Sequence, residues 1–338
     1  MQFAENFSLK ELNTFGMDVK ATFYYELNSK SELVDLLQAM QKNQKPVLFL
    51  GGGSNILFTK DFDGYVVRIV SKGIEIVESN ECNCYVKVQA GEAWDSLIAF
   101  CLKQNLYGLE NLTGIPGSVG SSPIQNIGAY GVEVKDCIHQ VNFTRIEDGK
   151  DFELNVNECH FGYRDSIFKR ELKGKVVITS VVFCLSKQAK FVLNYGGVAD
   201  EVNSLSKDNV TLRTVSEAIV RIRNRKIPDP KVLGSAGSFF KNPIITKNAF
   251  DELIAKFPKM ISYKISEQSY KIAAAWLIEQ CGWKGYRKND AGVSETQPLI
   301  LVNFGNASGH HIFLLSQKVQ QSVFKKFSII IEPEVNIL

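Results

Sequence analysis

GIPGSVGSSPIQNIGAYG, from Gly114 to Gly131, places glycines at positions 114, 117, 120, 128 and 131 among the apolar residues Ile115, Val119, Ile124 and Ile127. Glycines lack a Cβ, so main-chain N–H groups beside them stay open to close approach by a ligand. A plain surface loop rarely interleaves so many small residues with apolar ones. The stretch therefore predicts a loop that wraps an extended anionic ligand with main-chain donors.

A second glycine loop, Gly51 to Asn55, directly follows a predicted strand, Pro46–Leu50. A tight turn after a strand explains this loop equally well. It fits neither the Rossmann fingerprint nor the P-loop, because the GxGxxG spacing and the GK[ST] ending are both missing. Two glycine loops in the N-terminal half nevertheless favour a dinucleotide as the ligand.

The chain has 338 residues, and at about 150 residues per domain this predicts two or three domains. The 39 Lys and Arg residues nearly balance the 36 Asp and Glu residues, so a nucleic-acid surface is not expected. The longest apolar run, Ile272–Ile278, is far shorter than the roughly 20 residues of a membrane span. The first residues show no signal peptide, and we expect a cytoplasmic protein without a membrane partner.

Seven cysteines, an odd number, are spread along the chain, which predicts reduced thiols rather than a disulfide framework. Cys82 and Cys84 form a lone C-x-C without a second pair, and the four histidines fit no HExxH pattern. No metal site is expected.

Helices and strands are predicted in mixed order. Capping boxes at Ser29–Glu32 and Thr214–Glu217 begin helices that end near Asn43 and before Pro228. Further helices are predicted around Trp94–Cys101 and at Phe250–Phe257, Tyr270–Cys281 and Ile312–Phe327, and further strands at Tyr85–Ala90, Val176–Leu185 and Ile329–Val335. Ile227–Pro230 is typical of a linker. This order favours an α+β protein of several small domains over one doubly wound sheet.

NTFG, LGGGSNIL, the long glycine stretch, FGYRDS, GSAGSFFKNP, AAAWLIEQCGWKG and IEPEV follow one another between Asn13 and Val335. Together they resemble the UDP-N-acetylenolpyruvoylglucosamine reductase family. The resemblance implies an FAD-binding fold of the vanillyl-alcohol-oxidase type with a separate C-terminal substrate-binding domain. It divides the chain into FAD-binding subdomain 1 (1–70, with the terminal strand 328–338), FAD-binding subdomain 2 (71–227) and the substrate-binding domain (228–327).

The implied activity is that of a UDP-N-acetylmuramate dehydrogenase of peptidoglycan precursor synthesis. It would reduce the enolpyruvyl group of UDP-N-acetylglucosamine enolpyruvate with NADPH, through FAD. The UDP-sugar and NADPH are the expected partners, and a monomer is expected. The resemblance assigns cofactor contacts to Gly51, Gly52, Gly53, Ser54, Asn55, Gly114, Ile115, Pro116, Gly117, Ser118, Gly120, Ser122, Gln125, Asn126, Gly128 and Ala129.

Three residues match the family's catalytic positions. Arg164 would face the substrate carboxylate, for which a guanidinium fork is suited; the alternative is an ion pair with Asp165. Ser238 would donate the proton to the enolate-like carbon, or merely bond its own turn. Glu334 would act with Arg164 in polarising the substrate, or be an ordinary exposed charge.

Four further residues match substrate contacts: Tyr195, Lys226, Asn242 and Gln297, whose phenol, ammonium and amide donors suit a diphosphate. Tyr195 also indicates the longer family type, in which its loop folds over the substrate. The sequence departs from the family at Val293–Thr296, where many members have Val-His, which puts the details around Gln297 in doubt.

Two other functions stay open. The same FAD fold could serve an alcohol oxidase that uses oxygen, although the set of Arg164, Ser238 and Glu334 argues against it. A flavin or nucleotide sensor without turnover is the non-enzymatic alternative.

Overall fold

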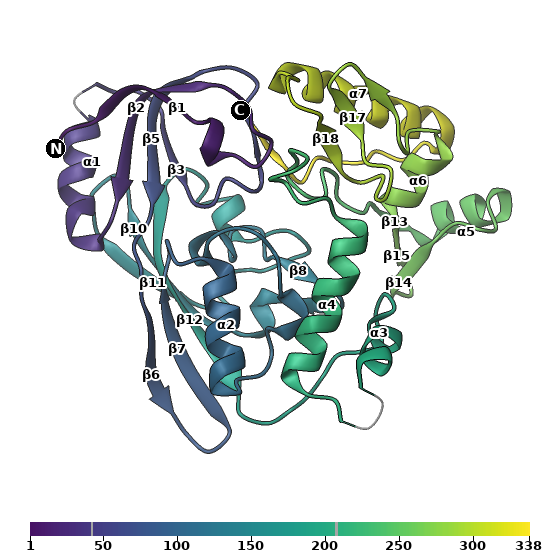
Figure 1. The fold of residues 1–338 in the computed structure, drawn as a ribbon, viewed down its shortest axis with the longest axis horizontal. Coiled ribbons are helices and arrows are strands. Elements are labelled where there is room, and N and C mark those ends of the chain that lie inside the picture. The colour runs from purple at the N-terminus through teal and green to yellow at the C-terminus, as the bar shows by residue number, and fades with distance from the viewer. Residues whose placement is uncertain (42, 207–208) are drawn as a thin grey trace. The chain divides into compact units, whose positions relative to one another are not determined.

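The structure is a computed structural model and describes residues 1–41, 43–206 and 209–338 (Figure 1). It contains two compact units. Unit 1 comprises Met1–Phe7, Ala21–Gly52 and Asp63–Arg223, and unit 2 comprises Ser8–Lys20, Gly53–Phe62 and Asn224–Leu338. The division into 1–70 with 328–338, 71–227 and 228–327 stays a prediction.

The first sheet of unit 1 has four strands in the order β1-β2-β5-β3, which are Ala4–Ser8, Lys20–Leu27, Phe62–Ile69 and Val47–Leu50. β3 and β5 run parallel, with Val47 opposite Tyr65. Helix α1, Leu33–Gln41, lies beside this sheet (Figure 1). Its apolar stripe is buried against Tyr65 and Val67, as the helical spacing of these residues predicts.

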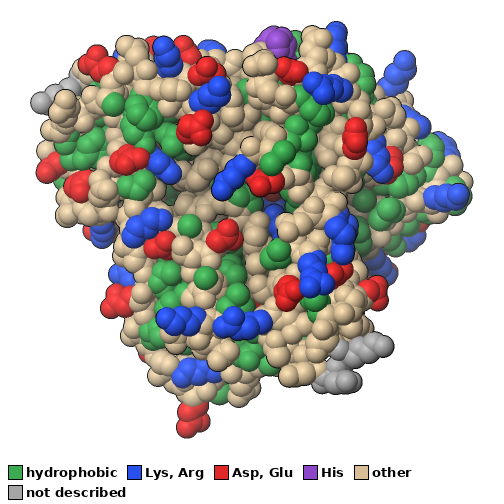
Figure 2. Space-filling model, viewed as in Figure 1, with side chains coloured by type: hydrophobic (Ala, Val, Ile, Leu, Met, Phe, Trp, Pro, Cys, Tyr) green, Lys and Arg blue, Asp and Glu red, His purple; other side chains and the backbone are tan. Residues whose placement is uncertain are grey.

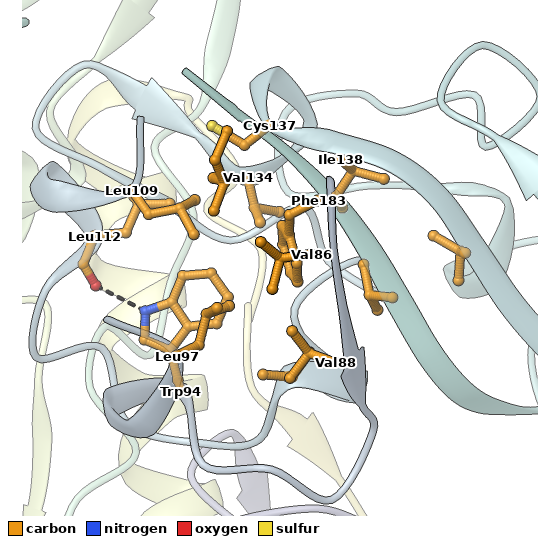
Figure 3. Close-up of a cluster of buried hydrophobic side chains, with 14 of the residues drawn as sticks. Val86, Val88, Trp94, Leu97, Leu109, Leu112, Val134, Cys137, Ile138 and Phe183 are labelled. Carbon is orange, nitrogen blue, oxygen red and sulfur yellow. Dashed lines mark hydrogen bonds between the residues drawn. The ribbon is translucent and has the colours of Figure 1, made fainter. Parts of the chain in front are cut away.

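The second sheet of unit 1 is antiparallel, in the order β11-β10-β12-β7-β6. Its strands are Asp151–Asn155, Ile138–Arg145, Val176–Ser186, Asn83–Gln89 and Ile74–Ser79. Helix α2, Trp94–Gln104, buries Trp94 and Leu97 in the same core as Val86 and Phe183 of the sheet (Figure 3). The indole N–H of Trp94 donates to the carbonyl of Leu112 at 2.9 Å. This bond satisfies the one polar atom of the ring and ties α2 to the segment that leads into Gly114–Gly131.

Unit 1 also contains a short hairpin, helix α3, Val198–Leu205, and helix α4, Leu212–Lys226, as far as Arg223, while the last three residues of α4 belong to unit 2. The hairpin consists of β8, Gly128–Ala129, and β9, Val132–Glu133, at the end of the glycine stretch. Helices α3 and α4 share a small core of their own around Val202 and Ile219.

Unit 2 contains three small sheets. β4, Ile56–Leu57, pairs in parallel with β19, Asn336–Ile337. A sheet in the order β13-β15-β14 consists of Ile244–Thr246, Ser269–Ile272 and Ser262–Ser266, and helix α5, Lys247–Lys256, stacks Phe250 on Tyr270 of this sheet. The third sheet, β16-β17-β18, consists of Arg287–Lys288, Ala291–Val293 and Leu301–Asn303. In the chain, helix α6, Ala274–Gln280, precedes this sheet and helix α7, Gly309–Phe327, follows it (Figure 1).

The predicted capping boxes do not form. The Ser29 hydroxyl bonds the Glu32 carboxylate at 3.1 Å instead of a backbone N–H, and Lys30–Glu32 is a 3-10 turn before α1. In α4 the Thr211 hydroxyl accepts from the N–H of Thr214 at 3.1 Å, so the helix begins before the predicted box. In both cases a neighbouring hydroxyl or carboxylate competes for the same short-range bond.

Two other predicted elements were wrong. The helix predicted at Tyr270–Cys281 begins only at Ala274, because Ser269–Ile272 is held as the central strand β15 by partners on both sides. The strand predicted at Ile329–Val335 is largely absent: Pro333 forms a single bridge with Phe240, and regular pairing begins at Asn336. Proline has no N–H with which to continue a ladder. The other predicted helices and strands are confirmed within a few residues at either end.

Lysine and arginine side chains lie scattered among aspartate and glutamate on the face drawn in Figure 2, rather than gathered into one positive field. Throughout residues 1–41, 43–206 and 209–338, no helix has both the length and the apolarity that crossing a bilayer takes.

The burial of α2 gives a direct stability prediction. Leu97 in α2 is fully buried, whereas Leu314 in α7 is 40% exposed. Leu97→Ala removes apolar contacts and leaves a cavity, so it should lower the free energy of unfolding by about 2–5 kcal/mol. The matched change Leu314→Ala should alter it by less than about 1 kcal/mol. Denaturant unfolding of both variants measures the difference, and equal effects would contradict the burial of α2.

The seven cysteines are free thiols, of which Cys82 is exposed. Burial raises the pKa of Cys101, Cys137 and Cys159 to about 12. Because the thiolate is the nucleophile, these three stay protonated and inert at about pH 8. Iodoacetamide should therefore label Cys82 in the native protein, and it should label Cys101, Cys137 and Cys159 only after unfolding. Peptide mass spectrometry measures the labelling of each cysteine. Rapid native labelling of Cys101 would contradict this core.

Candidate functional site

Gly51 and Gly52, which begin the first glycine segment, lie against the second glycine segment in unit 1. A Cβ built on Gly52 would lie 2.8 Å from the Cα of Gly117, and one built on Gly51 would collide with the Ser118 hydroxyl. The carbonyl of Gly117 accepts from the N–H of Trp94 at 3.0 Å, so the second segment is fixed to the start of α2. Only glycine at position 52 allows two backbones this close. The structure thus brings together two parts of the predicted cofactor site.

Two buried polar atoms, one within the Gly114–Gly131 segment and one just before it, make no hydrogen bond to the described residues. The Ser122 hydroxyl is 1% exposed and has no hydrogen-bond partner among the described residues, and the same holds for the side-chain carbonyl of Asn111. A buried polar atom without a partner is costly, so such atoms indicate a missing ligand group or water.

Arg164 lies at the tip of the FGYRDS turn. Gly162 and Asp165 exchange backbone hydrogen bonds at 2.9 and 3.2 Å across the turn, and Arg164 has a φ of +55°. Its guanidinium donates to the carbonyl of Gly128 at 2.6 Å. A Cβ on Gly128 would lie 3.0 Å from that guanidinium, so glycine provides the space for this contact. The turn therefore places Arg164 at the far end of the glycine stretch.

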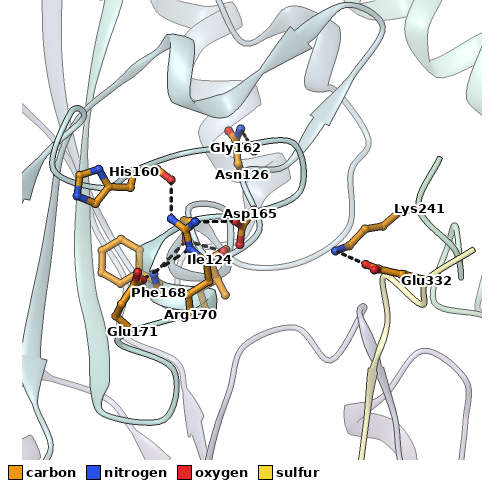
Figure 4. A network of polar contacts seen from close by, with 11 residues as sticks. Ile124, Asn126, His160, Gly162, Asp165, Phe168, Arg170, Glu171, Lys241 and Glu332 are labelled. Atoms are coloured by element: carbon orange, nitrogen blue, oxygen red, sulfur yellow. Dashed lines mark hydrogen bonds and ion pairs between the residues drawn. The ribbon is translucent and has the colours of Figure 1, made fainter. Parts of the chain in front are cut away.

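Three polar contacts hold the FGYRDS turn in place (Figure 4). The Asn126 side-chain amide donates to the carbonyl of Gly162 at 2.9 Å, and the Ser166 hydroxyl donates to the carbonyl of Ile124 at 2.7 Å. Arg170 pairs with the Asp165 carboxylate at 3.3 Å. Asp165 therefore has an ion-pair partner in Arg170, and Asn126, a predicted cofactor contact, also supports the turn.

Arg223 was missed by the sequence reasoning. This α4 residue is half-buried beside Gly114, where a Cβ on the glycine would lie 3.3 Å from its Nε. Burial lowers the pKa of Arg223, while nearby Tyr130 and Asp95 oppose that shift. Its guanidinium makes no hydrogen bond or ion pair within the part of the chain that the structure describes. The run of cations at Arg221, Arg223, Arg225 and Lys226 is the signal that could have revealed it.

Tyr195 lies beside Gly131, the last residue of the Gly114–Gly131 segment. A Cβ on Gly131 would lie 3.4 Å from the Cβ of Tyr195 and 3.1 Å from a methyl group of Val192. The Asn111 amide donates at 2.8 Å to the carbonyls of both Tyr130 and Val192. The loop that carries Tyr195 therefore packs on the end of the glycine stretch.

In unit 2, Ser238 is exposed between glycine and two buried phenylalanines, Phe239 and Phe240. The N–H of Phe239 donates to the carbonyl of Leu299 at 2.8 Å, which fixes the backbone. The Ser238 hydroxyl forms no hydrogen bond with any residue in 1–41, 43–206 or 209–338. This arrangement weighs against the interpretation in which the hydroxyl bonds its own turn.

Glu334 lies beside the same segment. Its N–H donates to the carbonyl of Phe239 at 2.7 Å, and its carbonyl accepts from the side-chain amide of Asn55 at 3.4 Å. Next along the segment, Lys241 pairs with Glu332 at 3.5 Å (Figure 4). The backbone around Ser238, the backbone of Glu334 and the side chain of Asn55 are therefore joined by hydrogen bonds.

The three predicted substrate contacts of unit 2 keep donors available. The side-chain carbonyl of Asn242 accepts from the N–H of Ala274 at 2.9 Å, at the start of α6. Lys226 is exposed at the end of α4, and Gln297 lies in the loop before β18. Considering the described residues alone, the amide nitrogens of Asn242 and Gln297 donate no hydrogen bond, and Lys226 pairs with no carboxylate.

The structure does not bring all the predicted site residues together within one unit. Arg164 and Tyr195 belong to unit 1, whereas Ser238, Glu334, Lys226, Asn242 and Gln297 belong to unit 2. The meeting of Arg164 with Ser238 and Glu334 stays a prediction. No group of His, Cys, Asp or Glu side chains placed to hold a metal ion occurs in the described ranges.

Comparisons with known proteins identify the family of the chain. Residues 21–155 match the FAD binding domain, and residues 229–338 match the C-terminal domain of UDP-N-acetylenolpyruvoylglucosamine reductase. The protein of that name from Flavobacterium johnsoniae is 46% identical over 100% of both chains. The one from Chromobacterium violaceum is 44% identical over 100% of this chain and 99% of its own.

Solved structures show the same fold. UDP-N-acetylenolpyruvylglucosamine reductase from Thermus caldophilus superposes with a TM-score of 0.70 at 23% identity, over 100% of this chain and 99% of its own. A solvent-stable cholesterol oxidase superposes with a TM-score of 0.52 at 12% identity, over 98% and 86%. The expected α+β, FAD-binding fold of the vanillyl-alcohol-oxidase type is confirmed.

The matched FAD binding domain and the relatives define a flavin-dependent oxidoreductase that binds FAD. Gly51 and Gly52, packed against the Gly114–Gly131 segment, form what we call the glycine cradle. The cradle and the unpaired Ser122 hydroxyl fit such a dinucleotide, whose phosphates need close main-chain approach. More particularly, the chain belongs to the UDP-N-acetylenolpyruvoylglucosamine reductase family.

The cradle gives a prediction for cofactor binding. Gly52→Ala forces the two glycine segments apart, so FAD affinity should fall on the order of tenfold or more. Gly174→Ala is the control: a Cβ at this position would enter open space, although its φ is positive, at +70°. It should cost about 1 kcal/mol of stability and leave FAD binding unchanged. FAD titration of each apoprotein measures the affinity, and full retention by Gly52→Ala would contradict the cradle.

Proposed function

We propose that the chain reduces the enolpyruvyl group of UDP-N-acetylglucosamine enolpyruvate to give UDP-N-acetylmuramate, with NADPH as reductant, in peptidoglycan precursor synthesis. FAD, when bound, would supply the hydride chemistry that joins reductant and substrate. The observation that carries the proposal is Ser238, which has an exposed hydroxyl on a rigid backbone directly beside the Glu334 segment.

Arg164 has the role of binding the substrate carboxylate. Hydride addition to the enolpyruvyl group places negative charge on the α-carbon and its carboxylate, and a fixed cation stabilises that charge. The bond to Gly128 and the clamped turn orient the guanidinium before substrate arrives. Preorganisation of this kind avoids reorganisation at the moment of reaction.

Ser238 has the role of proton donor to the α-carbon. A hydroxyl is a weak acid, yet an enolate-like carbon is basic enough to take its proton when the two are within hydrogen-bond reach. Glu334 would polarise the substrate together with Arg164. The backbone bond from the Glu334 N–H to the Phe239 carbonyl keeps Glu334 beside the Ser238 segment.

Lys226, Asn242 and Gln297 have the role of holding the UDP diphosphate. An ammonium and two amide donors suit phosphate oxygens, and none of these donors is used by a described carboxylate or carbonyl. Tyr195, on its loop against Gly131, would close over the substrate from unit 1, and Arg223 adds a cation beside Gly114 for a phosphate of the cofactor.

Anaerobic rapid mixing tests the proposal as a whole. NADPH should bleach the bound flavin, and adding UDP-N-acetylglucosamine enolpyruvate should restore its absorbance with formation of UDP-N-acetylmuramate. Reoxidation by oxygen alone, with peroxide and no dependence on the sugar nucleotide, would overturn the proposal in favour of an oxidase. A flavin that NADPH cannot reduce would also overturn it.

Ser238→Ala isolates the proton-donor role. The variant should keep the rate at which NADPH reduces the flavin, because that step needs no proton from Ser238. Reoxidation by the sugar nucleotide should slow by about 10²-fold or more. Ser235→Ala, the same change in the same segment, should leave both rates near wild type. Equal reoxidation rates in Ser238→Ala and Ser235→Ala would contradict the proton-donor role of Ser238.

A further inference from the structure

The Ser-x-Thr sequence at residues 294–296 forms a compact turn in unit 2. Ser294 follows β17 and is 4% exposed. Its hydroxyl accepts from the N–H groups of Thr296 and Gln297, both at 3.3 Å. Two further backbone bonds, each 2.9 Å, join Ser294 N–H to the Ile300 carbonyl and Ile300 N–H to the Gln297 carbonyl. Hydrogen bonds within residues 294–300 therefore fix the backbone of the loop that carries Gln297.

Thr296 links this loop to the end of α4. Its hydroxyl donates to the carbonyl of Lys226 at 2.8 Å, and the hydroxyl oxygens of Thr296 and Ser294 are 3.1 Å apart. Because the Thr296 hydrogen goes to Lys226, the hydrogen between the two hydroxyls comes from Ser294. The bonds thus form one directed chain from Ser294 through Thr296 to Lys226.

The carbonyl at the end of this chain would otherwise be unsatisfied. Lys226 is the last residue of α4, and the last carbonyls of a helix have no partner inside the helix. Proline at position 228 prevents the helix from continuing. A hydroxyl from residue 296, seventy positions away in the sequence, therefore caps the helix end that carries the Lys226 ammonium.

We propose that Ser294 and Thr296 are positioning residues that set Lys226 and Gln297 in one fixed arrangement for the diphosphate of the sugar nucleotide. The inference rests on the proposed function, because it takes Lys226 and Gln297 as diphosphate contacts. Neither hydroxyl needs to touch the substrate. Ser294 orients the backbone of Gln297, and Thr296 joins that backbone to Lys226, so both donors keep their spacing when the ligand is absent.

Thr296→Val tests the link, because valine has the shape of threonine without its hydroxyl. Loss of one hydrogen bond to a helix-end carbonyl should weaken UDP binding about fivefold. The KM for UDP-N-acetylglucosamine enolpyruvate should rise by a similar factor with kcat little changed, since the lost interaction binds substrate and transition state alike. The rate of flavin reduction by NADPH should not move. Thr296→Ser keeps the hydroxyl and should bind UDP within about twofold of wild type.

Ser294→Ala provides a second variant in case Thr296→Val folds poorly, and it should weaken UDP binding in the same direction. Thr22→Val is the control, because it removes an exposed hydroxyl bond to Asp63 in unit 1 and should leave UDP binding unchanged. Calorimetric titration of the FAD-loaded protein with UDP reads the binding directly. Wild-type UDP affinity in Thr296→Val and Ser294→Ala, or failure of Thr296→Ser to restore it, would overturn the positioning role. If the wild-type protein bound no UDP, that result would contradict the proposed function itself rather than the positioning role of Ser294 and Thr296.

Discussion

The close approach of Gly52 to Gly117 is the constraint on which the cofactor side of unit 1 depends. No side chain at position 52 could be accommodated without moving the Gly114–Gly131 segment, because the obstacle is backbone rather than a flexible side chain. The segment in turn carries Gly128, to which Arg164 donates, and Gly131, on which the Tyr195 loop packs. The position of Arg164 therefore follows from a steric requirement at the other glycine loop.

Arg164 also shows how a strained residue is held. A left-handed backbone conformation costs a residue with a Cβ about 1 kcal/mol or more, and Arg164 adopts it at the tip of a two-residue turn. The reciprocal bonds between Gly162 and Asp165, the amide of Asn126 and the ion pair from Arg170 together outweigh that cost. Such strain persists where surrounding contacts over-determine it, which is characteristic of functional positions.

The sequence predicted well those features that periodicity or glycine content determines, and less well those determined by distant partners. The buried stripe of α1 and the β-branched strand β12 were found because their patterns are local. Tyr270–Ile272 was predicted as helix, whereas pairing with Ile244–Thr246 on one side and Ser262–Ser266 on the other holds it in a strand. Arg223 was overlooked for a similar reason: its place beside Gly114 depends on the packing of α4 within unit 1. Arg164, Ser238 and Glu334 were predicted from the family resemblance and not from a local pattern, because a single side chain in a turn or strand carries no periodic signal.

In unit 2 the predicted site residue Ser238 combines an exposed side chain with a backbone held by hydrogen-bonded neighbours. Ser238 is exposed, yet its backbone lies between the Leu299 carbonyl on one side and the Glu334 segment on the other, with Phe239 and Phe240 buried below it. The same loop continues from Leu299 to Gln297 and, through Ser294 and Thr296, to Lys226. The two small hydroxyls of Ser294 and Thr296 satisfy the backbone donors of the turn and the helix-end carbonyl. The hydrogen-bonded connection between the loop and the end of α4 therefore depends on the hydroxyls of Ser294 and Thr296.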